Sequence, residues 1–187
     1  VLRARDDETR DELGGGRGER ANGEVDDVFG AQLRFDGAGE RGSNPELVKK
    51  HGPPKLVGSV KELNQFIIVS PQCPEGRWWD TVALKGLIDY TVKTQPVDRR
   101  RIILTGLSMG GFATWELLAK HPDLAAAAVP ICGGGRPETA EKFKSVPIHV
   151  FHGTKDNAVP IKRSDEMVEA LKKAGGTPEY TVYPDAG

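Results

Sequence analysis

The stretch RIILTGLSMGGFATWELLAK, residues 101–120, decides the fold. Its continuous apolar run predicts a buried strand over 101–106, and the residues after it predict a helix from about Gly110 to Lys120. From Asn64 onward the chain repeats this alternation of short apolar runs and helical stretches. Such alternation is typical of a parallel sheet covered by helices on both faces, so we predict an α/β fold with a mostly parallel central sheet.

The same patterns place the other elements of this fold. The expected strands are 66–69, 125–131, 148–151 and 179–183, and the expected helices are 80–94 and 160–174. The buried side of the helix at 80–94 should carry Val82, Leu84, Leu87 and Ile88, with Val92 as a further candidate.

Composition excludes several classes of protein. The 187 residues include 26 basic and 27 acidic side chains, and this balance leaves no basic surface for nucleic acid and no polybasic membrane patch. No apolar run approaches the roughly 20 residues of a membrane-spanning helix. We interpret the two cysteines, Cys73 and Cys132, as free thiols, and the four histidines lack the spacing of metal ligands. We therefore expect no nucleic acid, membrane or metal as a partner.

The N-terminal part differs in composition from the rest. Residues 1–48 contain no lysine, and the first 35 residues are rich in Asp, Glu and Gly. We interpret 1–35 as a poorly defined N-terminal segment, either loosely attached or outside the native reading frame. Residues 36–187 then form the folded domain, which we expect to be truncated at its C-terminus.

The strongest chemical signal is a serine between the predicted strand and helix. Gly106-Leu107-Ser108-Met109-Gly110 matches the pattern G-x-S-x-G, in which the serine occupies a sharp strand-to-helix turn. The two glycines remove side chains that would collide in such a turn. The hydroxyl then stands at a helix N-terminus, whose dipole favours developing negative charge. Ser108 is the candidate nucleophile, and the amide of Met109 is one candidate oxyanion donor.

A nucleophilic serine needs a base, and the base needs an orienting acid. With this turn the order along the chain is serine, acid, histidine. Asp156 lies in the loop after the strand at 148–151 and is the candidate acid, with a turn or helix-capping aspartate as the alternative. The histidine should follow the last strand, but no histidine occurs after His152.

Several further segments fit one known pattern together with this turn. They are GAGERG at 37–42, SPQCP at 70–74 with Trp78 and Trp79, PICGGG at 130–135, and VFHG at 150–153 with Asp156. From about Gly37 to Gly187 the chain resembles an α/β-hydrolase of the esterase branch, close to prolyl-oligopeptidase-like and polyhydroxybutyrate-depolymerase-like enzymes. The resemblance implies a three-layer α/β-hydrolase fold, whose N-terminal strands are weak or missing in this sequence.

The resemblance also implies a role for each residue of the site. Ser108 would be the nucleophile and Asp156 the triad acid. The triad histidine would come directly after Gly187, so it is absent from this chain. Ala38 would supply the second oxyanion amide, although Asp36 stands where the family has a histidine.

The strand that precedes Asp36 departs from the family as well. The family's strand is hydrophobic and lies centrally, between the strands at 66–69 and 102–106, whereas Gln32 and Arg34 interrupt it here. Burying these polar side chains would cost free energy unless they are paired. An ionised Asp36 beside the oxyanion hole would also oppose the negative charge that forms there.

Other residues carry weaker signals. At least one of Trp78 and Trp79 is expected to line the substrate cleft, with core or surface packing as the alternative. His152 is expected to be a structural, hydrogen-bonded histidine, and His149 a core or helix-facing residue.

The sequence therefore predicts a serine carboxylesterase that hydrolyses small-molecule esters through an acyl-enzyme on Ser108, without a cofactor. The triad does not choose the acyl group, so a peptidase or a lactone hydrolase is an alternative. A non-catalytic protein of the same fold is another, because the triad histidine is absent. The oligomeric state stays open. The default compartment is the cytoplasm, and secretion is the alternative if an N-terminal signal has been lost.

Overall fold

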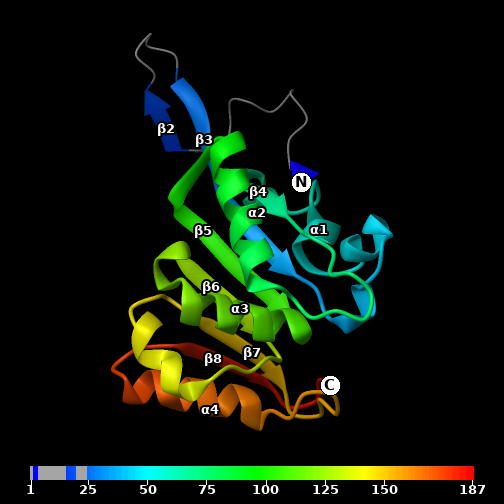
Figure 1. The fold of residues 1–187 in the computed structure, drawn as a ribbon, viewed down its shortest axis with the longest axis vertical. Helices are drawn as coiled ribbons and strands as arrows, with labels where there is room; N and C mark the ends of the chain where they lie inside the picture. The colour runs from blue at the N-terminus through cyan, green and yellow to red at the C-terminus, as the bar shows by residue number, and fades with distance from the viewer. Residues whose placement is uncertain (1, 4–15, 20–24) are drawn as a thin grey trace.

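The strands form one sheet in the computed structural model, which describes residues 2–3, 16–19 and 25–187. Residues 1, 4–15 and 20–24 of the predicted N-terminal segment lie outside this part. The strand order is β1-β4-β3-β5-β6-β7-β8, and β2 pairs with β3 (Figure 1). The strands are β1 (Leu2–Arg3), β2 (Gly16–Glu19), β3 (Val25–Phe35), β4 (Phe66–Val69), β5 (Val97–Leu107), β6 (Ala127–Ile131), β7 (His149–Gly153) and β8 (Glu179–Tyr183).

The sheet is mostly parallel, as predicted. β3 pairs in parallel with both β4 and β5, and β6, β7 and β8 follow in parallel beyond β5. β1 and β2 pair antiparallel with their neighbours. The half-apolar strand β3 thus lies centrally between β4 and β5, the position predicted for it.

Helices cover the sheet on both faces at its centre. They are α1 (Gly52–Leu56), α2 (Thr81–Thr94), α3 (Met109–Lys120) and α4 (Lys162–Lys173). Figure 1 shows α2, α3 and α4 along one face, and Leu33, Phe35, Leu84, Ile88 and Trp115 are buried there in one core cluster. On the other face of β3, the Arg34 side chain lies against Gly52 at the start of α1. None of the helices in the described residues is long and apolar enough to cross a membrane.

The prediction for the buried side of α2 was wrong at one position. Leu84 and Ile88 are buried, but 76% of Val82 is exposed. Residues two apart on a helix do not share a face, so Val82 cannot accompany Leu84 into the core. Asp80 begins the helix by accepting from the amides of Val82 and Ala83 at 2.8 and 3.4 Å.

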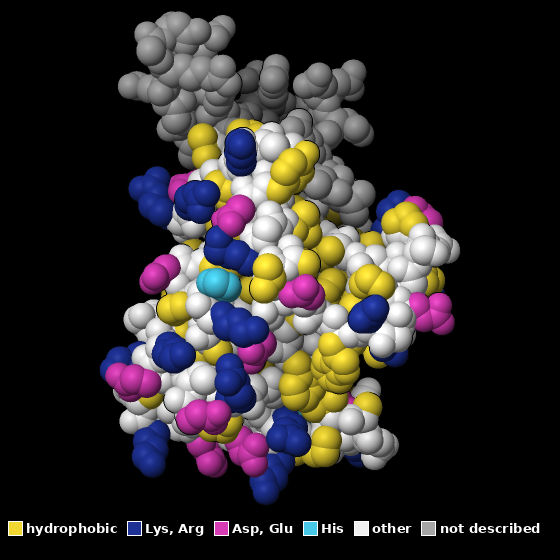
Figure 2. Space-filling model, viewed as in Figure 1, with side chains coloured by type: hydrophobic (Ala, Val, Ile, Leu, Met, Phe, Trp, Pro, Cys, Tyr) yellow, Lys and Arg dark blue, Asp and Glu magenta, His cyan; other side chains and the backbone are white. Residues whose placement is uncertain are grey.

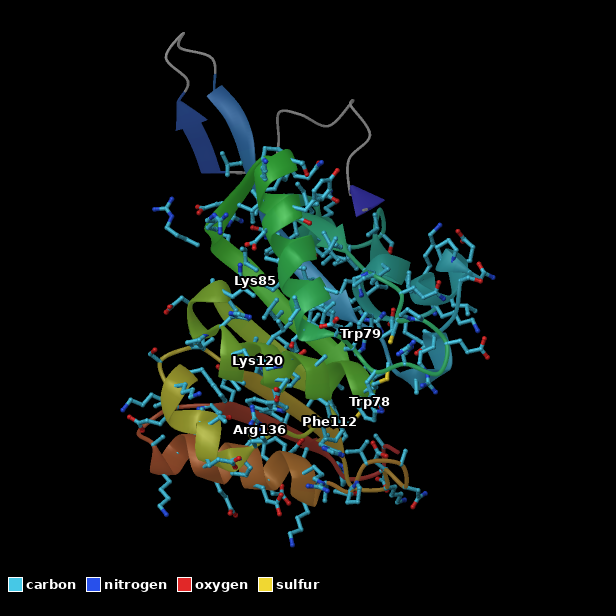
Figure 3. All side chains as sticks on the ribbon, viewed as in Figure 1. Trp78, Trp79, Lys85, Phe112, Lys120 and Arg136 are labelled. Carbon is cyan, nitrogen blue, oxygen red and sulfur yellow. The ribbon has the colours of Figure 1, made fainter. Side chains whose placement is uncertain are left out.

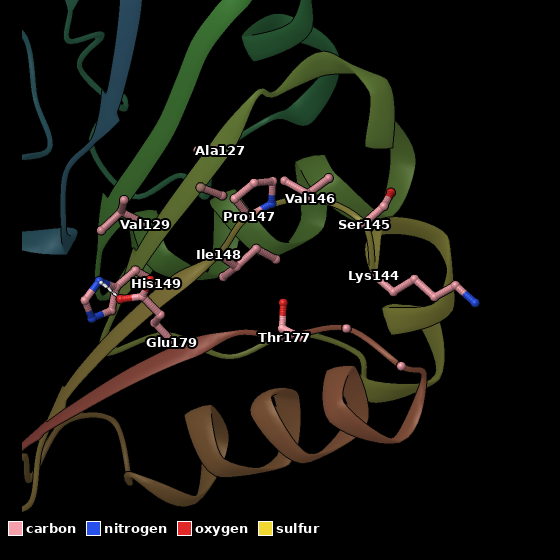
Figure 4. A pocket seen from close by; sticks show the side chains of 13 residues that line it. Ala127, Val129, Lys144, Ser145, Val146, Pro147, Ile148, His149, Thr177 and Glu179 are labelled. Carbon is pink, nitrogen blue, oxygen red and sulfur yellow. Dashed lines mark ion pairs between the residues drawn. The ribbon is translucent and has the colours of Figure 1, made fainter.

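A cavity of about 490 Å³ opens where β6 and β7 begin (Figure 4). These strands pair only through Ile131 and Phe151, with one isolated bridge nearer their start. His149 lies at this cavity, with Nε2 2.8 Å from Thr181 Oγ1 and Nδ1 3.3 Å from Glu179 Oε2. The prediction of a core or helix-facing His149 was therefore wrong. The reason is strand alternation: Val150 faces the core and α4, so His149 faces the other side and is half-exposed.

Candidate active site

Ser108 occupies the turn between β5 and α3, where its backbone has φ 55° and ψ −114°. A non-glycine residue with positive φ is strained, and such strain is concentrated at functional sites. The turn is held at both ends, because Ser108 N–H donates to Ile131 O at 2.9 Å and Phe112 N–H donates to Ser108 O at 3.1 Å. The serine is thereby fixed at the positive end of the α3 dipole.

The glycines on either side of Ser108 are required by close backbone approaches. A Cβ on Gly106 would collide with the carbonyl of Gly110, and a Cβ on Gly110 would collide with the carbonyl of Phe35. The second approach brings the end of β3 directly against the first turn of α3. Any side chain at Gly110 would therefore push the nucleophile away from the loop that follows β3.

This loop lies beside the nucleophile. A Cβ on Gly37 would lie 3.7 Å from Ser108 Cβ. Ala38 begins a short 3-10 helix, and its carbonyl accepts from Arg41 Nε at 3.0 Å, which fixes the orientation of this turn. The loop of Ala38 and the first residue of α3, Met109, thus meet at Ser108 from two different elements, as a pair of oxyanion donors would require.

The two charged residues near this loop form a buried ion pair. Arg34 and Asp36 are 4% and 2% exposed, and their side chains contact each other. Burial raises the pKa of Asp36 to about 6; Arg34 opposes this rise and Glu40 adds to it. The pair gives the buried Arg34 the partner it needs, and it balances the charge of Asp36 beside the loop. Gln32 is only half-buried.

The two tryptophans predicted for the cleft lie in different environments. Trp79 is half-buried, packs against Phe35 with ring centroids 5.6 Å apart, and donates its indole N–H to Asp36 O at 3.1 Å. It anchors the backbone that leads into the Ala38 loop. Trp78, in contrast, is 67% exposed and meets Phe112 edge-on at 6.2 Å (Figure 3).

Asp156 lies in the loop between β7 and α4, and 11% of its side chain is exposed. Its Oδ1 accepts from the amides of Ala158 and Val159, each at 2.8 Å. These bonds are those of a turn aspartate, which the sequence analysis gave as the alternative role for Asp156. Oδ2 lies 3.7 Å from His152 Nε2. The backbone bonds therefore fix the direction of the carboxylate through one oxygen, which is what an orienting acid needs.

Cys132 connects the nucleophile turn with this acid. It follows β6 with φ 39°, and its N–H donates to Phe151 O of β7 at 2.8 Å, next to the bond from Ser108 N–H to Ile131 O. Burial raises the pKa of the thiol to about 11; the Ser108 backbone opposes this rise and Asp156 reinforces it. The thiol therefore stays protonated. From the sequence, Cys132 was predicted only to be a free thiol. Its position at the end of a central parallel strand does, however, indicate the edge of the sheet at which Ser108 and Asp156 lie.

His152 has the contacts of the structural histidine predicted for it. Nδ1 lies 2.8 Å from Ser164 Oγ, and Nε2 lies 2.8 Å from Val159 O. Ser164 Oγ in turn donates to Gly133 O at 3.0 Å. These bonds tie the Asp156 loop to α4 and to the loop after β6. Ser164 was missed from the sequence, because nothing local marks a buried hydroxyl on a polar helix.

The fold and the turn at Ser108 define a protein of the α/β-hydrolase class. The model of the dienelactone hydrolase family matches residues 80–187, which is more than half of the chain. The chain therefore belongs to the dienelactone hydrolase family.

Similar proteins include esterases. A thermostable esterase of known structure is 29% identical, with a TM-score of 0.74, over 92% of this chain and 48% of that chain. A Methylorubrum extorquens protein, provisionally named carboxymethylenebutenolidase, is 25% identical over 76% of this chain and 51% of its own length. A bifunctional acetylxylan esterase/xylanase of Neocallimastix patriciarum is 30% identical over 68% of this chain and 21% of its own. The chain thus spans about half the length, or less, of these relatives. The esterase resemblance seen in the sequence is confirmed.

Proposed function

We propose that this chain is the catalytic part of a serine carboxylesterase for small-molecule esters. One observation carries the proposal: Ser108 has the strained backbone of a nucleophile turn, and the loop of Gly37 and Ala38 lies beside it. On the other side, backbone bonds from Ser108 to β6 and from Cys132 to β7 lead to the strand that precedes the Asp156 loop. Membership of the dienelactone hydrolase family and the esterase relatives support the same reaction.

The proposed reaction has two halves. Ser108 Oγ attacks the ester carbonyl while a histidine takes its proton, and the amides of Met109 and Ala38 stabilise the oxyanion. The tetrahedral intermediate collapses, the alcohol leaves with the proton from the histidine, and an acyl-enzyme remains. Water, activated by the same histidine, then attacks the acyl carbon and releases the acid.

We place the histidine directly after Gly187. The end of the chain lies against the loop of the acid: Lys155 N–H donates to Ala186 O at 2.8 Å, and a Cβ on Gly187 would lie 3.5 Å from Asp156 N. The next residue would therefore begin beside Asp156. This supports the assignment of Asp156 as the group that orients the base.

A lactone is the second candidate substrate. The family that the chain belongs to is named for a lactone hydrolase, and the M. extorquens relative carries a name of the same kind. A lactone is a cyclic ester, so the same nucleophile and oxyanion donors would open it. Comparing the hydrolysis rates of a lactone, a short linear ester and a peptide amide distinguishes these three classes of substrate.

The test uses the full-length protein and its Ser108→Ala variant. We expect turnover of ethyl acetate, and a loss of at least about 10³-fold in kcat for the variant, because the nucleophile is removed while the oxyanion donors stay. Release of acid at constant pH measures both rates. Equal rates in parent and variant would exclude Ser108 as the nucleophile. A folded full-length protein with no turnover at all would favour the non-catalytic alternative.

A further inference from the structure

An aromatic pair, the half-buried Phe112 and the exposed Trp78, lies near the nucleophile. Phe112 is four residues after Ser108, and its amide bonds to the Ser108 carbonyl. The ring of Trp78 stands at 90° to that of Phe112. Figure 2 shows apolar side chains gathered on the face where Figure 3 labels Trp78 and Phe112. A tryptophan that is 67% exposed at such a place is available to a ligand.

This pair forms one wall of a groove of about 270 Å³. The groove begins at Met109, the first residue of α3, and runs along the helix to Glu116. Gly134 and Gly135 contribute backbone alone to its lining, and a Cβ on Gly134 would lie 3.2 Å from the Phe112 ring. Pockets for drug-sized ligands span about 300–1,000 Å³, so this smaller groove suits a single ring.

The far end of the groove is charged. Glu116 Oε1 lies 3.3 Å from Arg136 Nη2 and 3.3 Å from Lys120 Nζ. Lys120 also donates to Thr81 Oγ1 at 2.8 Å. The Arg136 side chain is 55% exposed, and its guanidinium has five N–H donors in a fixed plane. Donors and a carboxylate acceptor thus stand side by side at the end opposite the nucleophile.

The two ends together favour one class of ligand. A sugar ring has an apolar C–H face that packs on an aromatic ring, and hydroxyls at its rim that both donate and accept hydrogen bonds. A simple alkyl chain would match the aromatic wall but would desolvate the charged end without forming any bonds there. We propose that the groove is a subsite for a pyranose ring on the alcohol side of the ester, with Trp78 as its stacking surface and Arg136 and Glu116 as its hydroxyl partners. The proposal rests on the ester hydrolysis assigned to Ser108.

The test compares two substrates in the full-length protein. Acetylated xylotriose carries the sugar, and ethyl acetate has the same acyl group without it. We expect Trp78→Ala to lower the ratio of kcat/KM for the acetylated sugar to that for ethyl acetate by roughly tenfold, mainly through KM, because stacking is lost. Arg136→Met should lower the same ratio. Tyr90→Ala is the matched control, because Tyr90 is an aromatic residue 63% exposed on α2 outside the groove, and should leave the ratio unchanged.

Binding without catalysis separates this inference from the proposed function. In the Ser108→Ala protein, saturation-transfer NMR with unmodified xylotriose should show transfer to the ring C–H protons, and Trp78→Ala should abolish it. Serine-dependent turnover of ethyl acetate without this transfer would overturn the sugar subsite and leave the esterase intact. A Trp78 effect that instead grows with acyl chain length, from acetate to hexanoate, would assign the groove to the acyl group and also overturn it.

Discussion

Arg34 and Asp36 form a buried ion pair that balances the negative charge of Asp36 close to the candidate site. An aspartate beside an oxyanion hole would oppose catalysis, but here it is buried against a guanidinium that balances it. Asp36 directly follows β3, and its side chain lies on the same side of the chain as that of Arg34, because residues two apart in extended backbone share a face. The pair could therefore have been found from the sequence, since opposite charges at this spacing on a central strand imply pairing.

The raised pKa of Asp36 makes stability depend on pH. Its folded pKa of about 6 lies above its ordinary value of 3.8, so the native state binds more protons than the unfolded state between these values. The contribution of Asp36 to stability is thus present below pH 3.8 and is lost as the pH rises through about 6. Asp36→Asn removes this titration. We expect its free energy of unfolding, relative to the parent, to rise by about 1–3 kcal/mol from pH 4 to pH 7.

Urea unfolding at several pH values measures this difference. Asp123→Asn, at an exposed position outside the site, is the matched control and should not reproduce the trend. A difference between Asp36→Asn and parent that stays constant or falls with pH would contradict the raised pKa.

At the scale of elements, α2 depends on its N-cap residue, Asp80, which directly precedes the helix. Asp80 caps two amides at the start of this helix, which in turn brings Leu84 and Ile88 into the core. Asp80→Ala should lower the free energy of unfolding by about 1 kcal/mol. The expected fall in Tm is about 2–4 °C for a chain of this size. Thermal unfolding followed by circular dichroism measures the shift.

The conservative variant serves as the control for the cap. Asp80→Asn keeps a side-chain oxygen that can accept from the same amides, and it should retain most of the stability. An equal loss in both variants would point to the charge of Asp80 rather than to its hydrogen bonds.

The sequence predicted the helices and strands correctly where the residues within an element determine its structure. The limits of β4 and β8 and the course of α3 follow from apolar runs and from the breaker after His121. The weakly apolar pattern of β3 does not by itself indicate a central strand; the family resemblance predicted that position, and parallel pairing with β4 and β5 holds the strand there. In the candidate site, the sequence motif of the strand-to-helix turn was enough to predict Ser108. Phe112 and Arg136 come from separate elements, and no local spacing brings them together.

For the whole molecule, stability should vary across the sheet. β3 and β5 are paired on both sides and lie against the core cluster, whereas β8 is the outermost strand in the described part of the chain. We expect the backbone amides of β3 and β5 to exchange with deuterium slowest and those of β8 fastest among the parallel strands. Mass spectrometry of exchange at the peptide level measures the order. Equal protection of β8 and β5 would contradict this gradient.

The central position of β3 has a consequence for synthesis. Ala31 pairs with Ile67 and Ile102, so the strand leaves the ribosome well before either of its partners exists. Parallel pairing over such distances is slow, and an unpaired apolar strand is prone to aggregate in the meantime. Charged side chains suppress such aggregation. We therefore expect Arg34 and Asp36, which pair inside the native protein, to suppress aggregation of the nascent strand until its neighbours have been synthesised.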